Sequence, residues 1–111
     1  MGFNTRTINT IAFRSGTTIT NGSEVEVVPL NTTHCGIKFK PLNGGPEVKI
    51  KIRYEIAHQY LAGFNKAPSV KSLEKKFSEM STCKTPIGNT VEVDGQDQYG
   101  FPSWCSILLG V

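Results

Sequence analysis

The stretch "IKFKPLNGGPEVKIKIRYEI", from Ile37 to Ile56, decides how the first half of the chain folds. Apolar and charged residues alternate on both sides of an Asn-Gly-Gly-Pro connection at residues 43–46. Alternation with a period of two is typical of a strand with one buried face, and glycine and asparagine favour tight hairpin connections. The stretch therefore predicts an antiparallel hairpin with arms at residues 36–42 and 47–54.

One face of this hairpin carries a cluster of positive charge. Because side chains alternate between the faces of a strand, burial of Ile37 and Ile50 directs the neighbouring cations to the opposite face. These cations are Lys38, Lys40, Lys49, Lys51 and Arg53. Two interpretations stay open: the face is simply solvated and prevents edge-to-edge association, or it binds the phosphate backbone of a nucleic acid.

The residues before the hairpin also favour strands. Ile11 and Phe13 alternate with polar residues, and Val25 and Val27 alternate with glutamates after an Asn-Gly turn. Such segments are typical of antiparallel partners in one sheet. An N-terminal antiparallel sheet is therefore expected.

After the hairpin, the apolar period changes from two to nearly four. Residues Ala57 to Phe64 favour a short helix that stops at a glycine. Residues Ser69 to Met80 predict a clearer helix, with Ser69 as the N-cap and an apolar stripe at Val70, Leu73, Phe77 and Met80. The other face of this second helix carries Lys71, Lys75 and Lys76, which could also contact phosphates.

The C-terminal third reads as turns and short strands. A turn at residues 86–89, a strand through Val91 and Val93, a loop rich in glycine and aspartate, and a last strand over 104–111 are expected. Phe101 and Trp104 flank the Pro-Ser of "FPSW". They either anchor the last strand in the core or form an exposed hot spot for a protein partner.

These elements predict a single α+β domain over residues 1–111, with an N-terminal antiparallel sheet, two short central helices and a C-terminal hairpin. Two helices followed by a hairpin is also the order of a winged helix-turn-helix. The alternative organisation therefore separates a β region at residues 1–53 from a winged helix-turn-helix-like region at residues 54–111.

Charge is unevenly distributed along the 111 residues, whose net charge is +3. Residues 48–84 contain eight basic and three acidic side chains, whereas residues 85–111 contain three acidic side chains and no basic one. A basic middle segment of this kind favours an anionic partner.

The three cysteines, Cys35, Cys83 and Cys105, are widely spaced and form no Cys-x-x-Cys pair, which favours a reducing compartment. No apolar run is long enough for a membrane span. His34, Cys35, His58 and Cys83 either assemble a zinc site or a Cys-His nucleophile, or they are buried thiols and surface histidines; no pair has finger-like spacing. The sequence therefore predicts a cytoplasmic, non-enzymatic protein without a cofactor, a metal or a small-molecule substrate.

Two resemblances add to this interpretation. Residues 57–64, 69–80 and the Thr-Pro-x-Gly at residues 85–88 resemble the helices and wing of DNA-binding domains of the MerR and excisionase type. The motifs "SLEKKF", "TVEVDG" and "GFPSW" resemble a group of small uncharacterised proteins of enterobacterial prophages. The resemblances imply a winged helix-turn-helix, a mobile-element origin and a bacterial host.

Two functions are therefore expected from the sequence. The first is a phage-type or prophage-type accessory protein that binds nucleic acid through the basic hairpin and the second helix. The second is a small inhibitor that binds and blocks a host protein of the defence or replication machinery. A homodimer formed through the hairpin edge is compatible with both.

Overall fold

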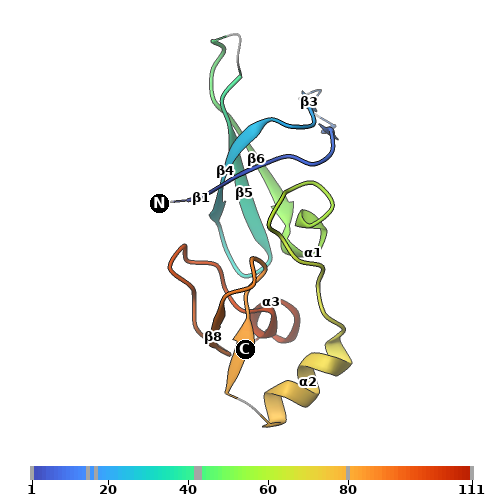
Figure 1. Cartoon of the computed structure of the whole chain (residues 1–111), viewed down its shortest axis with the longest axis vertical. Coiled ribbons are helices and arrows are strands. Elements are labelled where there is room, and N and C mark those ends of the chain that lie inside the picture. Colours follow the sequence, from blue (N-terminus) through green and yellow to red (C-terminus); the bar gives the residue numbers. More distant parts are fainter. Residues whose placement is uncertain (1, 15, 17, 42–43, 80, 111) are drawn as a thin grey trace.

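A four-stranded antiparallel sheet forms the N-terminal half of the protein (Figure 1). Its strands lie in the spatial order β1 (Phe3–Arg6), β4 (Glu24–Pro29), β5 (His34–Phe39) and β6 (Val48–Arg53). The structure is a computed structural model that describes residues 2–14, 16, 18–41, 44–79 and 81–110, without the side chains of residues 76 and 77.

The hairpin predicted from the opening stretch is confirmed. β5 and β6 pair antiparallel, with Ile37 opposite Ile50 and Lys38 opposite Lys49. Residue 42 of the predicted first arm and residue 43 of the predicted connection lie outside the described part of the chain. The pairing places the apolar residues of both strands on one face, as the period of two requires.

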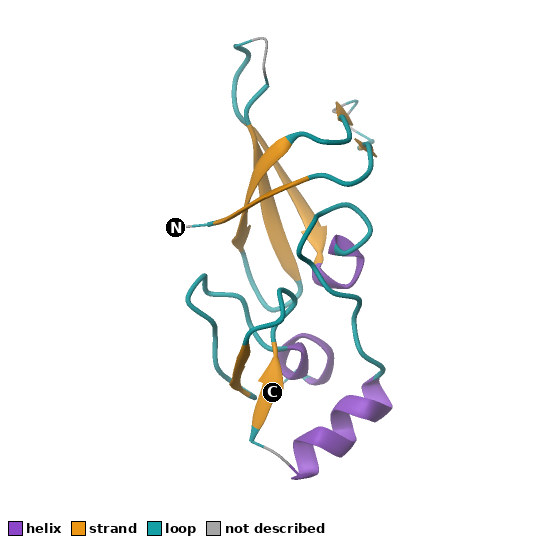
Figure 2. Cartoon of the chain, viewed as in Figure 1, coloured by secondary structure: helices purple, strands orange, loops and turns teal. Residues whose placement is uncertain are grey.

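Among the described residues, two smaller strand pairs and three helices accompany this sheet (Figure 2). The pairs are β2 (Ile11–Ala12) with β3 (Thr18–Ile19), and β7 (Thr82–Lys84) with β8 (Thr90–Glu92). The helices are α1 (Tyr54–Ala57), α2 (Val70–Glu79) and α3 (Trp104–Leu109). The protein is thus an α+β domain with a mostly antiparallel sheet.

The expectation of a last strand over residues 104–111 is wrong, because Trp104–Leu109 forms the helix α3; residue 111 lies outside the described residues. Ser103 has an extended backbone and its Oγ accepts a hydrogen bond from the Ser106 N–H at 3.1 Å, so it caps the helix. Gly110 ends α3 in the left-handed conformation, with a φ of 73°. A helix leaves backbone N–H groups unpaired at its start and carbonyl groups unpaired at its end. A serine N-cap and a C-terminal glycine are the residues that help to satisfy these groups.

The first predicted helix is also displaced. The sequence placed it at residues 57–64, but α1 covers only Tyr54–Ala57 and turns follow it. Leu61 pairs in an isolated antiparallel bridge with Thr7, and the Ala62 N–H donates to the Arg6 carbonyl at 3.0 Å. These long-range bonds to the N-terminal segment replace the helical bonds that the local spacing favoured.

The second predicted helix is confirmed as α2, which begins one residue after Ser69. The Ser69 Oγ accepts a hydrogen bond from the Ser72 N–H at 3.2 Å, as expected of an N-cap. Leu73 of the predicted apolar stripe is buried. The predicted last residue, Met80, lies outside the described residues, as does the side chain of Phe77.

A cluster of aromatic rings joins the sheet to the C-terminal segment. Phe3 on β1 packs edge-on against Phe64 and Phe101, with centroid distances of 5.7 and 6.4 Å. Phe101 also contacts Tyr54 at 6.2 Å. One core therefore includes residues from both predicted regions, 1–53 and 54–111, and these rings form part of the contact between them.

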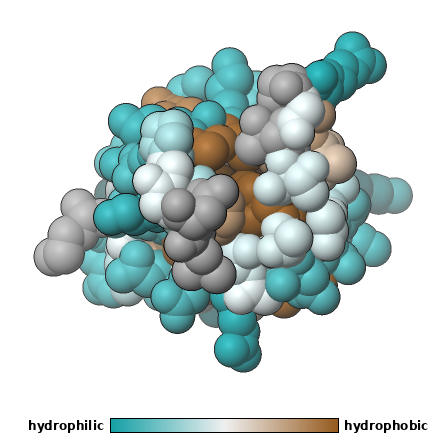
Figure 3. Space-filling model, turned by 90° about the horizontal axis from the view of Figure 1, so that it is seen from above, coloured by the Kyte–Doolittle hydropathy of each residue, from teal (hydrophilic) through white to brown (hydrophobic). Residues whose placement is uncertain are grey.

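The molecule is elongated, with extents of 50 × 24 × 20 Å. Figure 1 shows the connection between β5 and β6 at one end and α2 at the opposite end. Seen from the first end, the molecule presents hydrophobic surface surrounded by hydrophilic side chains (Figure 3). Within the described residues, no helix is long and apolar enough to cross a membrane.

Candidate functional site

The polar face of the sheet is built from aligned residues of all four strands. One row runs from Asn4 through Glu26 and Lys38 to Lys49, because the strand register pairs each with the next. Side chains opposite one another in a sheet project to the same side. The row therefore crosses the sheet from the edge strand β1 to the edge strand β6.

Charge changes along this row from acidic to basic. Glu24 and Glu26 lie on β4, whereas the cations gather on or just after β5 and on β6: Lys38, Lys40, Lys49, Lys51 and Arg53. The structure thus brings the five predicted hairpin cations to one side of the sheet, with the lysines and Arg53 of β6 exposed at its edge. We call these five residues the hairpin cations.

Two of the hairpin cations have carboxylate partners. Lys38 Nζ lies 3.8 Å from Glu26 Oε1, and Arg53 Nε donates to Glu55 Oε2 at 3.1 Å. Both ion pairs are partly exposed and hold their cations only weakly. Lys49 and Lys51 take part in none of the ion pairs found among the described residues.

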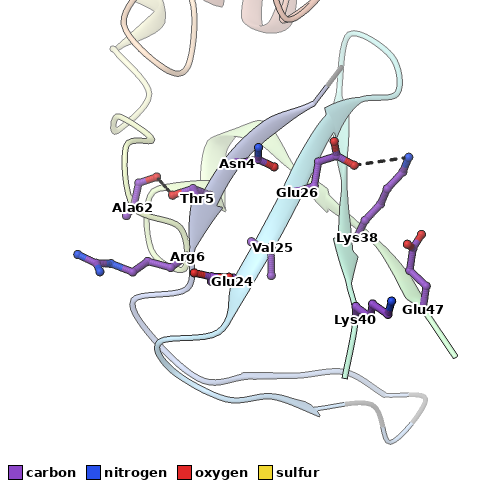
Figure 4. A pocket seen from close by; sticks show the side chains of 10 residues that line it. All are labelled: Asn4, Thr5, Arg6, Glu24, Val25, Glu26, Lys38, Lys40, Glu47 and Ala62. Carbon is purple, nitrogen blue, oxygen red and sulfur yellow. Dashed lines mark hydrogen bonds and ion pairs between the residues drawn. The ribbon is translucent and has the colours of Figure 1, made fainter. Parts of the chain in front are cut away.

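A groove of about 660 Å³ lies on the acidic side of this face (Figure 4). Its lining includes three basic and three acidic side chains: Arg6, Lys38, Lys40, Glu24, Glu26 and Glu47. Figure 4 shows Glu26 and Lys38 pointing toward each other, while Arg6 extends away from them. Because the acidic and basic side chains compensate each other, the groove itself does not select an anion.

A smaller hollow of about 140 Å³ lies on the basic side, between β4 and β6. Gly36 on β5 has no side chain to fill it, and a Cβ built there would lie 3.4 Å from Leu30. Leu30, which is 52% exposed, lines this hollow together with Lys49 and Lys51. Sequence reasoning missed this hollow, although a glycine inside a strand is a signal of close approach.

The cations of α2 lie elsewhere in the molecule. Lys71 and Lys75 are exposed on a helix that packs against α3 and β7, and the side chain of Lys76 lies outside the described set. Figure 1 shows α2 at the end of the molecule far from the hairpin connection. The structure therefore does not bring the helix cations and the hairpin cations to one common surface.

Phe101 and Trp104 are core residues, with 0% and 2% of their surface exposed. The interpretation of these two residues as an exposed hot spot is therefore wrong, because a partner cannot contact rings that are already covered. Phe101 fills the aromatic cluster, and Trp104 begins α3 beneath the β7–β8 pair.

The candidate zinc-binding and nucleophilic residues do not form a metal site or a Cys-His pair in the described part of the chain. His34 and Cys35 are neighbours in β5 and so face opposite sides of the sheet. His34 Nδ1 lies 2.6 Å from Thr33 Oγ1, whereas Cys35 is buried, which raises the pKa of its thiol to about 12. In the part of the chain that the structure describes, no three His, Cys, Asp or Glu side chains are grouped to hold a metal ion.

Comparisons with family models, with curated proteins and with solved structures found no match to this chain. The geometry and charge of the sheet face are the observations that bear on function.

Proposed function

We propose that this protein is a non-enzymatic nucleic-acid-binding protein whose contact surface is the row of hairpin cations along β6 and the adjacent β5. One observation carries the proposal: the strand register places Lys38 directly opposite Lys49, although like charges in such a pair repel. Glu26 holds Lys38 only weakly, so a bound polyanion compensates the repulsion that remains between the two lysines.

The spacing of the cations fits a charged backbone. Alternate residues of a strand are about 6.8 Å apart, so Lys49, Lys51 and Arg53 present a regular line of positive charge. Lysines contact phosphates as point charges, and contacts to phosphates carry no sequence information. The proposed binding is therefore independent of sequence and strongly dependent on salt.

The proposal extends to the prophage-type role and to the winged arrangement of residues 54–111, each with less support. The resemblance of the C-terminal motifs supports the role, and the order of α2 followed by β7 and β8 supports the wing. A helix-turn-helix joins its helices by a turn of roughly three or four residues. Here α1 ends at Ala57 and α2 begins at Val70, so we place the main contact on the hairpin.

The test is a binding titration with labelled single-stranded and duplex oligonucleotides at two salt concentrations. The double variant Lys49→Gln/Lys51→Gln should lower affinity about tenfold or more and reduce the salt slope by about 2, one per lost phosphate contact. The matched control, Lys71→Gln/Lys75→Gln, removes the same charge from α2 and should change affinity little. No binding by the unchanged protein, or a larger loss from the control, would overturn the hairpin proposal.

A second candidate function, the host-protein inhibitor, is favoured by a different feature of β6. Its outer edge pairs with no other described strand, and an open strand edge can receive an extended segment of a partner. The basic side chains would select an acidic segment. Capture of a bacterial protein that persists after nuclease treatment and is lost in Lys49→Glu/Lys51→Glu supports this candidate; capture abolished by nuclease refutes it.

A further inference from the structure

We propose that Cys83 and Cys105 form a dithiol site that small anionic disulfides oxidise to an intramolecular disulfide. The two Sγ atoms lie 2.9 Å apart, although the residues are 22 positions apart in the sequence. The site is independent of the hairpin cations and of the proposed function.

The backbone holds the two thiols in this position. Cys83 is the central residue of β7, where it pairs with Val91, and Cys105 lies in the first turn of α3. Two hydroxyls attach α3 to the strand pair, since Ser103 Oγ and Ser106 Oγ both donate to the Val93 carbonyl, at 2.5 and 3.1 Å. A disulfide has an S–S length of about 2.05 Å, so less than about 1 Å of movement closes the bond.

A pocket gives access to one of the two thiols. Cys83 lines a hollow of about 280 Å³ together with Leu73, Trp104, Lys66 and Lys84. Cys83 is 5% exposed, whereas Cys105 is fully covered. A reagent that enters the pocket therefore meets Cys83 first.

The charge of the pocket selects the reagent. Lys66 and Lys84 line it, and its lining contains no carboxylate among the described residues. The carboxylates of oxidised glutathione fit this arrangement, whereas a cationic disulfide such as cystamine is repelled.

The reaction is a thiol–disulfide exchange in two steps. The Cys83 thiolate attacks one sulfur of oxidised glutathione, which forms a mixed disulfide and releases one glutathione thiolate. The Cys105 thiolate then attacks Cys83 Sγ, the bond to glutathione breaks, and a second glutathione thiolate leaves. Two thiol protons pass to the two glutathione thiolates, and the two electrons lost by the cysteines reduce one glutathione disulfide.

Cys35 provides an internal comparison. It lies on β5 and is fully covered, with 0% of its surface exposed. Burial also raises the pKa of its thiol to about 12, which leaves little of the reactive thiolate at neutral pH. The native chain should therefore oxidise at Cys83 and Cys105 and spare Cys35.

The first experiment follows the intact mass of the full chain in a redox buffer of reduced and oxidised glutathione. The expected product has lost two hydrogen atoms, and peptide mapping joins Cys83 to Cys105 while Cys35 remains alkylatable after unfolding. Its thermal midpoint should rise by about 10 °C and return on reduction. A chain that stays fully reduced, or a link that includes Cys35, would overturn the proposal.

The second experiment uses variants to separate the steps. Cys105→Ser should stop at the mixed disulfide on Cys83, Cys83→Ser should form no adduct while folded, and the control Cys35→Ser should oxidise like the unchanged chain. Lys66→Gln/Lys84→Gln, which keeps both thiols, should slow oxidation by glutathione disulfide several-fold and not slow oxidation by cystamine. Equal rates for the two reagents in the unchanged chain would refute the anionic selectivity.

Discussion

Lys38 on β5 lies directly opposite Lys49 on β6, and both side chains project from the same face of the sheet. Like charges in such a cross-strand pair destabilise a sheet by a few tenths of a kcal/mol. Lys49→Gln should therefore raise the free energy of unfolding by about 0.5 kcal/mol while weakening nucleic-acid binding. Urea titrations and binding titrations on the same variant measure the two effects.

The matched control for this change is Lys75→Gln on α2, which should alter neither quantity appreciably. A Lys49→Gln protein that binds as tightly as the unchanged chain would show that the repulsion has no role in recognition.

Asp97 organises the loop before α3, and its removal should be costly. Its Oδ1 accepts hydrogen bonds from the N–H groups of Tyr99 and Phe101, at 2.9 and 3.0 Å, and its Oδ2 accepts from Asn89 Nδ2 at 3.2 Å. Asp97→Ala leaves these donors unsatisfied and should lower the free energy of unfolding by about 3 kcal/mol. Chemical denaturation measures the loss, and the exposed neighbour Asp94 provides the comparison: Asp94→Ala should change stability by less than about 0.5 kcal/mol.

Tyr54 buries a hydroxyl that finds no hydrogen-bond partner among the described residues. Removing an unsatisfied buried polar atom relieves its desolvation cost. Tyr54→Phe should therefore leave the free energy of unfolding unchanged or raise it by up to about 1 kcal/mol. Thermal melts of this variant beside Tyr60→Phe, whose side chain is partly exposed, test the expectation; a clear loss of stability in Tyr54→Phe alone would contradict it.

Stability should fall at alkaline pH because of Cys35. Burial raises the pKa of its thiol from 9.0 to about 12 in the folded protein. A thiol whose pKa is higher in the folded than in the unfolded protein stabilises the folded state. This stabilisation is complete below the unfolded pKa of 9.0 and disappears as the pH rises from 9.0 to about 12. Burial also raises the pKa of Tyr54, in the same direction.

Denaturant titrations between pH 8 and pH 11, a range chosen to span about two pH units beyond the ordinary thiol pKa, measure this dependence. Cys35→Ala should lose stability less steeply with pH, even if its stability at neutral pH is lower because of the cavity. An identical slope in the variant would assign the alkaline loss to other groups.

The sequence predicts the hairpin well because all the information is local. The alternation around Ile37 and Ile50 and the intervening turn lie within one short segment, and the five hairpin cations follow from it. The N-terminus of α2 is predictable for the same reason, since Ser69 and the apolar stripe are close neighbours. The small hollow at Gly36 depends on Leu30, which lies between β4 and β5. The alternation of apolar and charged residues therefore could not predict it.

The errors in the C-terminal part have two physical causes. For α3, the signals were present, because Ser103 and Gly110 are an N-cap and a left-handed C-terminal residue, but the apolar run between them also suits a strand. For α1, the decisive contact is the pairing of Thr7 with Leu61, which no local pattern contains. The contact between Cys83 and Cys105 is likewise formed only by the tertiary fold.

The edge-on packing of Phe3 with Phe101 has a consequence for biosynthesis. The first of these rings leaves the ribosome nearly a hundred residues before the second, so β1 has no aromatic partner from this segment while the residues between them are translated. Until then Phe3 lacks one of its ring contacts, and the exposed Asn4 and Arg6 that alternate with the half-buried positions keep β1 partly polar.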